Sequence, residues 1–171
     1  MSSKDQNLSN YSLNRDTAKS QRIGIVVSDW NQDITHRLLE GCKETLLQEG
    51  ISAEDIYVIN VPGAFELPTG ARMIDDRHNL DAIICLGCVI KGETQHDQYI
   101  NNAIAHGIVQ LGMLRSKPFI YGVLTPNNMS QAEDRAGGDF GNKGVEAAVT
   151  ALKMIMVKEQ LRSSSKSIGF S

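Results

Sequence analysis

The segment from Gly87 to His96 contains residue types that bind an anion and move a proton. It reads GCVIKGETQH and leads from an apolar run into a helical pattern. Free backbone N–H groups and the helix dipole favour a phosphate at such a helix start. Glu93 stands where the nucleotide-binding P-loop has lysine, which disfavours a triphosphate and leaves a single phosphate held by the amides and the Thr94 hydroxyl. The competing interpretation is structural: Thr94 and Asp97 have capping-box spacing, and the glycines could simply turn the chain.

His96 is the candidate proton carrier. It falls in the first turn of the expected helix, where the dipole disfavours the imidazolium form. A neutral imidazole accepts and returns protons near neutral pH, as a general base and acid must. A lone histidine is more often an ordinary surface residue, but the neighbouring phosphate-binding pattern favours the catalytic role. The remaining histidines show no zinc-ligand spacing, which argues against a metal site.

Four further side chains are candidates for ligand contacts, each with a structural alternative. Trp30 offers a flat wall for a heterocycle, or a hydrophobic cover. Glu66 accepts hydrogen bonds from ligand hydroxyls, or only begins a helix. Arg135 binds a phosphate in a bidentate fork, or only stabilises a helix end. Lys143 begins the last helix, where a cation needs an anionic partner, which favours a ligand or an intersubunit contact.

Cys85 and Cys88 match the spacing C-x-x-C. A redox pair needs both thiols at a helix N-terminus, whereas Cys85 lies inside an apolar strand pattern. Their odd separation favours opposite faces of that strand. The pattern therefore does not predict a redox site.

Strands and helices alternate along the chain and would position these residues. Apolar runs predict strands at 22–28, 55–61, 82–90 and 118–125. Apolar periodicity, caps and breakers predict helices between Asn31 and Gly50 and at about 67–77, 94–114, 128–136 and 142–161. This alternation predicts a four-stranded parallel sheet in a three-layer α/β/α sandwich. Ligands bind at the carboxyl ends of such strands, where the candidate residues gather.

The composition fits one globular domain. The chain has 171 residues, 41% of them hydrophobic, and a formal net charge of −3, which argues against a disordered chain and against a nucleic-acid surface. No apolar stretch is long enough for a membrane span, and three cysteines form no disulfide framework, so we expect a cytoplasmic protein. We expect a flexible arm over residues 1–20, one domain over 21–162 and a polar tail over 163–171.

Five segments together carry a resemblance to a known family. They read IGIVVSDWN, VPGAFELP, GCVIKGETQHDQYI, YGVLTPNN and QAEDRAGGDFGNKGVEAA, within about residues 22–161. Their order and spacing resemble the 6,7-dimethyl-8-ribityllumazine synthase family of riboflavin biosynthesis. The resemblance implies a flavodoxin-like fold. It also implies a transferase that condenses 5-amino-6-(D-ribitylamino)uracil with 3,4-dihydroxy-2-butanone 4-phosphate, releasing phosphate and water, without a metal or organic cofactor.

The resemblance also implies a role for each matching residue. His96 matches the proton shuttle, and Trp30 the aromatic that stacks on the pyrimidine, where many members have Phe. The other matching residues bind the ribityl chain and ring (Ala64, Phe65, Glu66), read the pyrimidine edge through backbone (Cys88, Val89, Ile90), form the phosphate loop (Glu93, Thr94), or come from the neighbouring subunit (Tyr121, Arg135, Lys143). Cys88 replaces a frequent Thr, and Arg135 is the residue that would grip phosphate.

The resemblance implies an assembly of pentamers. The length of the segment RAGGDFGNKG favours a 60-subunit icosahedral shell, with riboflavin synthase as a further partner. Two other classes of protein share the expected architecture or assembly. One is a flavodoxin-like or receiver-like binding module, although Asp29 alone does not supply a receiver's acidic cluster. The other is a shell protein whose site has decayed, against which the presence of His96 and Arg135 argues.

Overall fold

A single parallel sheet organises the protein. The computed structural model describes residues 21–165, so the predicted arm (1–20) and residues 166–171 of the predicted tail lie outside the described residues. The strands are β1 (Ile23–Ser28), β2 (Ile56–Val61), β3 (Ala82–Cys88) and β4 (Phe119–Leu124). They run parallel in the order β2-β1-β3-β4. The predicted four-stranded parallel sheet is therefore confirmed.

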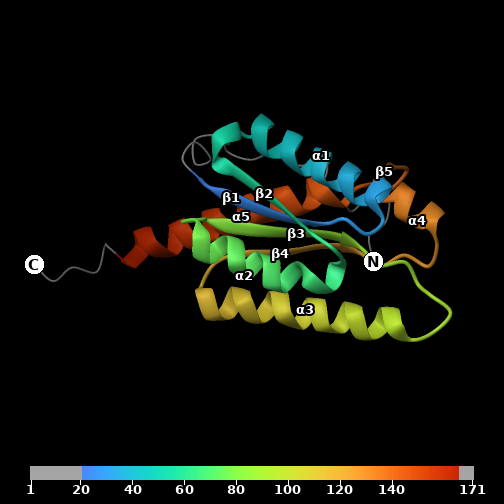
Figure 1. Ribbon diagram of the computed structural model, residues 1–171. Coiled ribbons are helices and arrows are strands. Elements are labelled where there is room, and N and C mark those ends of the chain that lie inside the picture. Colours follow the sequence, from blue (N-terminus) through green and yellow to red (C-terminus); the bar gives the residue numbers. More distant parts are fainter. Residues whose placement is uncertain (1–20, 166–171) are drawn as a thin grey trace, which may run out of the picture.

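Helices cover both faces of this sheet. Figure 1 shows α1 (Gln32–Gln48) and α5 (Lys143–Ser165) on one face and α2 (Leu67–Arg77) and α3 (His96–Arg115) on the other. The short α4 (Met129–Asp134) lies beyond the carboxyl end of β4. This arrangement is the predicted three-layer, flavodoxin-like sandwich. Among the described helices, none has both the length and the apolarity that a membrane crossing requires.

The alternation of side chains along the buried strands separates two apolar cores. Ile25 and Val27 of β1 pack toward α1 and α5 with Leu38 and Ala148, whereas Val26 packs toward the other face. On that other face the core includes Leu67, Ile83 and Ile104. Because both faces of the sheet are buried, the strands read as continuous apolar runs rather than alternating patterns.

Helices α1 and α5 approach each other closely at Gly144. A Cβ atom at this position would lie 1.9 Å from the carbonyl oxygen of Leu38. The first turn of α5 therefore requires glycine at residue 144 to sit against α1. This contact fixes the position of two nearby residues of the same helical turn, Lys143 and the buried Glu146.

The structure differs from the sequence-based expectation at three helix ends. Asn31 occupies the N-cap position of α1, but its side chain makes no capping bond. Helix α3 begins at His96 rather than Thr94, and its N-cap residue is Gln95, so the predicted capping box does not form. Helix α5 continues to Ser165, beyond the predicted end near residue 161 and into the predicted tail. Residues 161–163 of α5 are exposed, and sequence periodicity marks such helix ends poorly.

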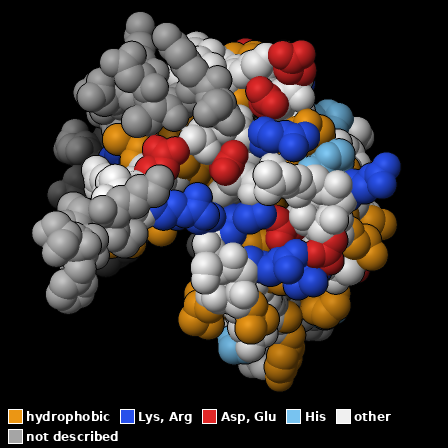
Figure 2. All heavy atoms as spheres, turned by 90° about the vertical axis from the view of Figure 1, so that its left-hand side faces the viewer, with side chains coloured by type: hydrophobic (Ala, Val, Ile, Leu, Met, Phe, Trp, Pro, Cys, Tyr) orange, Lys and Arg blue, Asp and Glu red, His pale blue; other side chains and the backbone are white. Residues whose placement is uncertain are grey.

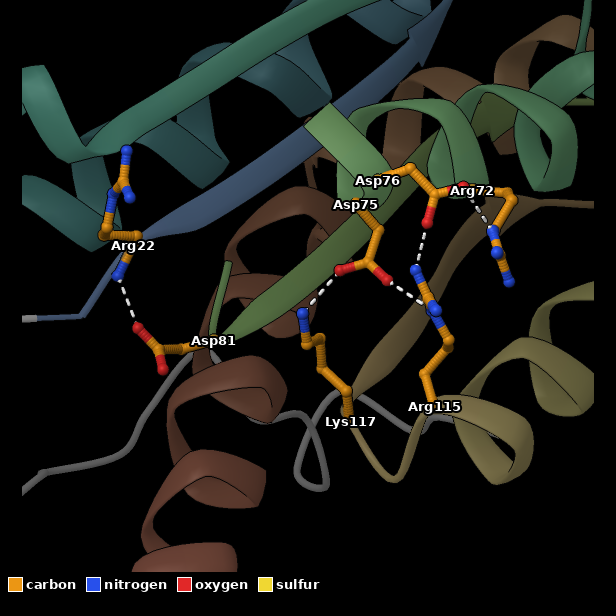
Figure 3. A network of polar contacts seen from close by, with 7 residues as sticks. All are labelled: Arg22, Arg72, Asp75, Asp76, Asp81, Arg115 and Lys117. Carbon is orange, nitrogen blue, oxygen red and sulfur yellow. Dashed lines mark hydrogen bonds and ion pairs between the residues drawn. The ribbon is translucent and has the colours of Figure 1, made fainter. Parts of the chain in front are cut away.

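A network of ion pairs lies at the amino end of the strands, away from the loops that follow them. Figure 2 faces this end and shows Lys and Arg side chains interleaved with Asp and Glu. The Asp75 carboxylate, whose side chain is only 1% exposed, accepts hydrogen bonds from Arg115 (Nε, 2.8 Å) and from Lys117. Arg115 also pairs with Asp76, as Figure 3 shows. The network ties the end of α2 to the end of α3 and the start of β4.

Candidate active site

A cavity of about 450 Å³ opens at the carboxyl ends of β1, β2 and β3. Nine of the thirteen site residues predicted from the sequence line it: Trp30, Ala64, Phe65, Glu66, Cys88, Val89, Ile90, Thr94 and His96. They come from three loops that are separate in the sequence and meet only because the strands are parallel and adjacent. The expectation of a ligand site at this edge of the sheet thus has a cavity to support it.

Backbone and amide hydrogen bonds hold the three loops together. The Asp29 N–H donates to the Val61 carbonyl at 2.8 Å, and the Trp30 N–H donates to the Pro62 carbonyl at 3.2 Å. The side-chain amide of Asn31 donates to the carbonyl of Cys88 at 2.9 Å. The ends of β1, β2 and β3 are therefore tied into one rim before any ligand arrives.

Asn31 makes its bond from an unusual backbone conformation. Its φ is 59° and its ψ is 47°, the left-handed region that Asn tolerates better than most residues. This geometry aims the amide across to β3 instead of onto the start of α1. The sequence predicted only a helix cap here, and an Asn in the short loop between a strand and a helix was the signal available for this second role.

Two large aromatic side chains border the cavity and face solvent. Trp30 is 71% exposed and Phe65 is 57% exposed in the single chain. Exposed aromatic surface beside a cavity is typical of a site that a ligand or a partner covers. Phe65 and Glu66 lie in a short 3₁₀ turn (Ala64–Glu66) that leads from β2 into α2.

His96 is the first residue of α3, and it lies in the first turn at the positive end of the helix, as the sequence predicted. Its backbone N–H points to the Thr94 hydroxyl oxygen at 3.4 Å, so Thr94 supports the start of the helix from outside it. Both residues line the cavity. Glu93 is exposed in the same loop but is not among the lining residues.

Cys88 ends β3, and its side chain is part of the core toward α1 and α5. Only 1% of the residue is exposed, so its thiol is not freely accessible. Cys85 packs in the opposite core. Burial raises the pKa of Cys85 to about 12 and that of Cys88 to about 11, so both stay protonated and unreactive near neutral pH. The redox interpretation of C-x-x-C is excluded by this geometry.

The remaining polar candidates form a second group. Tyr121, Arg135 and Lys143 line a separate cavity of about 340 Å³ beside β4. This cavity shares no lining residue with the cavity that contains His96. Burial raises the pKa of the Tyr121 phenol, which therefore remains neutral. One chain thus presents two separate parts of the predicted site.

A small hairpin, which the sequence did not predict, positions Arg135 and Lys143. Strands β5 (Ala136–Gly138) and β6 (Gly141–Asn142) form it between α4 and α5. The Lys143 N–H donates to the Arg135 carbonyl at 2.9 Å, which closes the hairpin. Gly137 takes a φ of 107°, a conformation that favours glycine.

Glu146 also belongs to this second group, although the sequence analysis did not select it. Its carboxylate accepts hydrogen bonds from Arg135 Nη2 at 3.3 Å and from Lys143 Nζ at 3.0 Å. The spacing of Lys143 and Glu146, three residues apart at a helix start, was a usable signal. Within residues 21–165, no group of three or more His, Cys, Asp and Glu side chains is arranged to hold a metal ion.

The fold and the cavities define a class: a flavodoxin-like α/β protein with a small-molecule site at the carboxyl edge of its sheet. The family model of 6,7-dimethyl-8-ribityllumazine synthase matches residues 20–159. Curated relatives with that name include proteins of Cytophaga hutchinsonii, 52% identical over 91% of this chain and 98% of the relative, and of Parabacteroides distasonis, 50% identical over 88% and 94%. A relative from Flavobacterium johnsoniae is 45% identical over 94% of this chain and 85% of its own.

The chain therefore belongs to the 6,7-dimethyl-8-ribityllumazine synthase family. The resemblance noted from the sequence is confirmed over nearly the whole described region. Membership in this family argues against the alternative of a flavodoxin-like or receiver-like binding module.

Proposed function

We propose that the chain catalyses the condensation of 5-amino-6-(D-ribitylamino)uracil with 3,4-dihydroxy-2-butanone 4-phosphate to 6,7-dimethyl-8-ribityllumazine, and that each site forms between two adjacent copies. Family membership supports the reaction as the last but one step of riboflavin biosynthesis. The observation that carries the shared site is the division of the predicted residues between two cavities of one chain.

The cavity with His96 supplies the surface for the heterocycle. Trp30 stacks on the pyrimidine, and backbone groups of Cys88, Val89 and Ile90 read its edge. The ribityl hydroxyls lie along Ala64, Phe65 and Glu66. The support is that these residues border one cavity whose rim is already tied by the Asn31–Cys88 hydrogen bond.

The neighbouring copy supplies the second part of the site. Its Arg135 grips the phosphoryl group in concert with the loop at Glu93 and Thr94, and its Tyr121 and Lys143 close the slot. The high exposure of Trp30 and Phe65 supports this model, because a second copy would cover apolar surface that the single chain leaves in water.

The chemistry requires two substrates to be oriented and several protons to be moved. The ring amine attacks the ketone and forms an imine with loss of water. Phosphate then leaves by elimination, and the ring closes with loss of a second water. Orientation of two substrates alone can supply roughly 7–11 kcal/mol of the barrier. His96, the first residue of α3, takes and returns the protons in these steps.

The proposed assembly is a cyclic pentamer, twelve of which build a 60-subunit shell that encloses riboflavin synthase as a partner. A heterologous, ring-closing contact is the symmetry in which every copy both gives and receives half a site. The length of the Arg135–Gly144 segment supports the shell. The proposed location is the cytoplasm, which the low cysteine content supports.

The direct test is to mix the two substrates with the purified protein and to follow the fluorescence of the lumazine product. We expect product formation that depends on both substrates and releases inorganic phosphate. A preparation that is folded and assembled, but forms no fluorescent product with either substrate in excess, would refute the proposed activity. Native mass measurement tests the assembly independently, and a monomer would contradict the shared site.

A further inference from the structure

We propose that Glu146 is a positioning residue that holds Arg135 and Lys143 in place between turnovers and competes with phosphate for Arg135, so that the phosphate product is released. The proposal rests on the proposed function, because it concerns the same anion site. It assigns a role to an acidic side chain in a place where the bound ligand is itself an anion.

The contacts of Glu146 are unusual for a carboxylate beside an anion site. Its side chain is 8% exposed, and its two oxygens have different cationic partners, Arg135 through Oε1 and Lys143 through Oε2. Arg135 and Lys143 both line the cavity beside β4. A buried carboxylate without such partners would be strongly destabilising, so these two cations permit its burial.

The two contacts of Glu146 differ in strength. The Lys143 contact is 3.0 Å, whereas the Arg135 contact is 3.3 Å, and a further contact of Arg135 with the Phe140 carbonyl is 3.4 Å. Charge-assisted hydrogen bonds are usually shorter, about 2.7–2.9 Å. The contact of Glu146 with Arg135 is therefore the weaker of its two, and the guanidinium can turn toward a phosphoryl group while Lys143 keeps the Glu146 charge compensated.

The charge balance gives this arrangement a consequence for product release. Two cations and one carboxylate leave a net positive charge, which attracts a phosphate dianion but less strongly than two uncompensated cations would. The Glu146 carboxylate reclaims Arg135 when phosphate leaves. Without that competing anion, we expect phosphate to bind more tightly and the enzyme to turn over more slowly.

The test compares Glu146→Gln with the wild-type enzyme, using inorganic phosphate as the probe. Gln keeps the size of the side chain and one acceptor oxygen but removes the charge. The dissociation constant of phosphate is measured by calorimetry and as competitive inhibition against the phosphate substrate, together with kcat and KM. We expect phosphate to bind about three- to tenfold more tightly in Glu146→Gln, with a lower kcat and a lower KM for the phosphate substrate.

These readouts separate positioning from a merely structural role. A disordered Arg135 would weaken phosphate binding and raise KM, so an unchanged or larger phosphate dissociation constant in a folded Glu146→Gln protein overturns the proposal. Glu159→Gln is the matched control, because Glu159 lies on the same helix, about 20 Å farther along its axis, and accepts a hydrogen bond from Gln21. We expect it to bind phosphate like the wild type, and a similar tightening in this control would also overturn the proposal.

A second variant decides the matter if Glu146→Gln does not fold. Glu146→Asp keeps the charge but shortens the side chain, so the longer contact to Arg135 is lost first. We expect phosphate binding about twofold tighter than in the wild type, and unchanged or weaker binding overturns the proposal. A wild-type enzyme that forms no lumazine refutes the proposed function instead, whereas normal wild-type turnover with unchanged phosphate binding in the variants refutes only the role of Glu146.

Discussion

Mixing two impaired variants tests the shared site most sharply. His96→Ala disables the cavity at the ends of β1, β2 and β3, and Arg135→Ala disables the cavity beside β4. Each homogeneous variant carries the defect in every site. If a site takes one cavity from each of two neighbouring copies, co-expressed variants form some sites in which both cavities are intact.

The expected recovery follows from the geometry. In a closed ring with equal and random mixing, a site is intact when one copy has an unaltered His96 and the next copy has an unaltered Arg135. The two conditions are independent, so about one quarter of the sites are intact, whatever the number of copies in the ring. The kcat of the mixture should therefore reach about a quarter of the wild-type value, well above the average of the two variants measured separately.

The assay is lumazine fluorescence on co-expressed proteins carrying two different affinity tags and purified through both. The control pair is His96→Ala with Trp30→Ala, which alters the same cavity in both variants. No site in that mixture can be fully intact, so we expect no recovery beyond the average. Recovery in the control pair, or none in the test pair despite mixed assemblies, would refute the division of the site between copies.

Three other predictions follow from the described contacts. His96→Ala should lower kcat about 10²-fold with little change in the KM of the uracil substrate, because the rest of the site still orients the two substrates. An unchanged kcat would show that His96 is not the proton carrier. Thiol reagents at pH 8 should leave Cys85 and Cys88 unlabelled in the folded protein and should label both after denaturation. The reason is that burial raises the pKa of these thiols to about 12 and about 11. Rapid labelling of the native protein at either cysteine would contradict their burial. Asp75→Asn should lower the free energy of unfolding by about 2–4 kcal/mol, because it leaves Arg115 and Lys117 without their buried charged partner; the measurement is the melting temperature. A Glu54→Gln control, which alters an exposed acid, should melt as the wild type does. An unchanged melting temperature in Asp75→Asn would show that the network contributes no net stability.

The order of strands and helices was predictable because the buried strands are continuously apolar and the breakers fall between them. The predicted helix 67–77 coincides with α2, which Pro68 at its first turn and the residues after Arg77 delimit clearly. The start of α3 was placed at Thr94 because its spacing to Asp97 imitates a capping box. The structure uses Gln95 and begins at His96. Local spacing of polar residues cannot distinguish a cap from a loop that precedes one.

Which candidates share a cavity was less accessible to sequence reasoning. Parallel strands bring Trp30, Phe65 and His96 to one edge, and the topology alone predicts that. The separation of Arg135 and Lys143 from His96 depends on the edge position of β4 and on the β5–β6 hairpin, whose three- and two-residue strands carry no periodic signal. Glu146 escaped notice because an acid in the first turn of a helix already has an ordinary explanation in the helix dipole.

The proposed division of the site between two copies has a physical reason, which is the limited ability of a single chain to exclude water. The cavity with His96 is bordered by aromatic side chains that remain more than half exposed, and His96 itself faces water. Imine formation and loss of water proceed best where bulk water is kept out. The cavity beside β4 has the complementary content, because Arg135 and Lys143 bring positive charge to it but it holds none of the residues that border the cavity with His96. The proposed assembly would bring the two cavities together, and activity would then depend on assembly rather than on the folding of one chain.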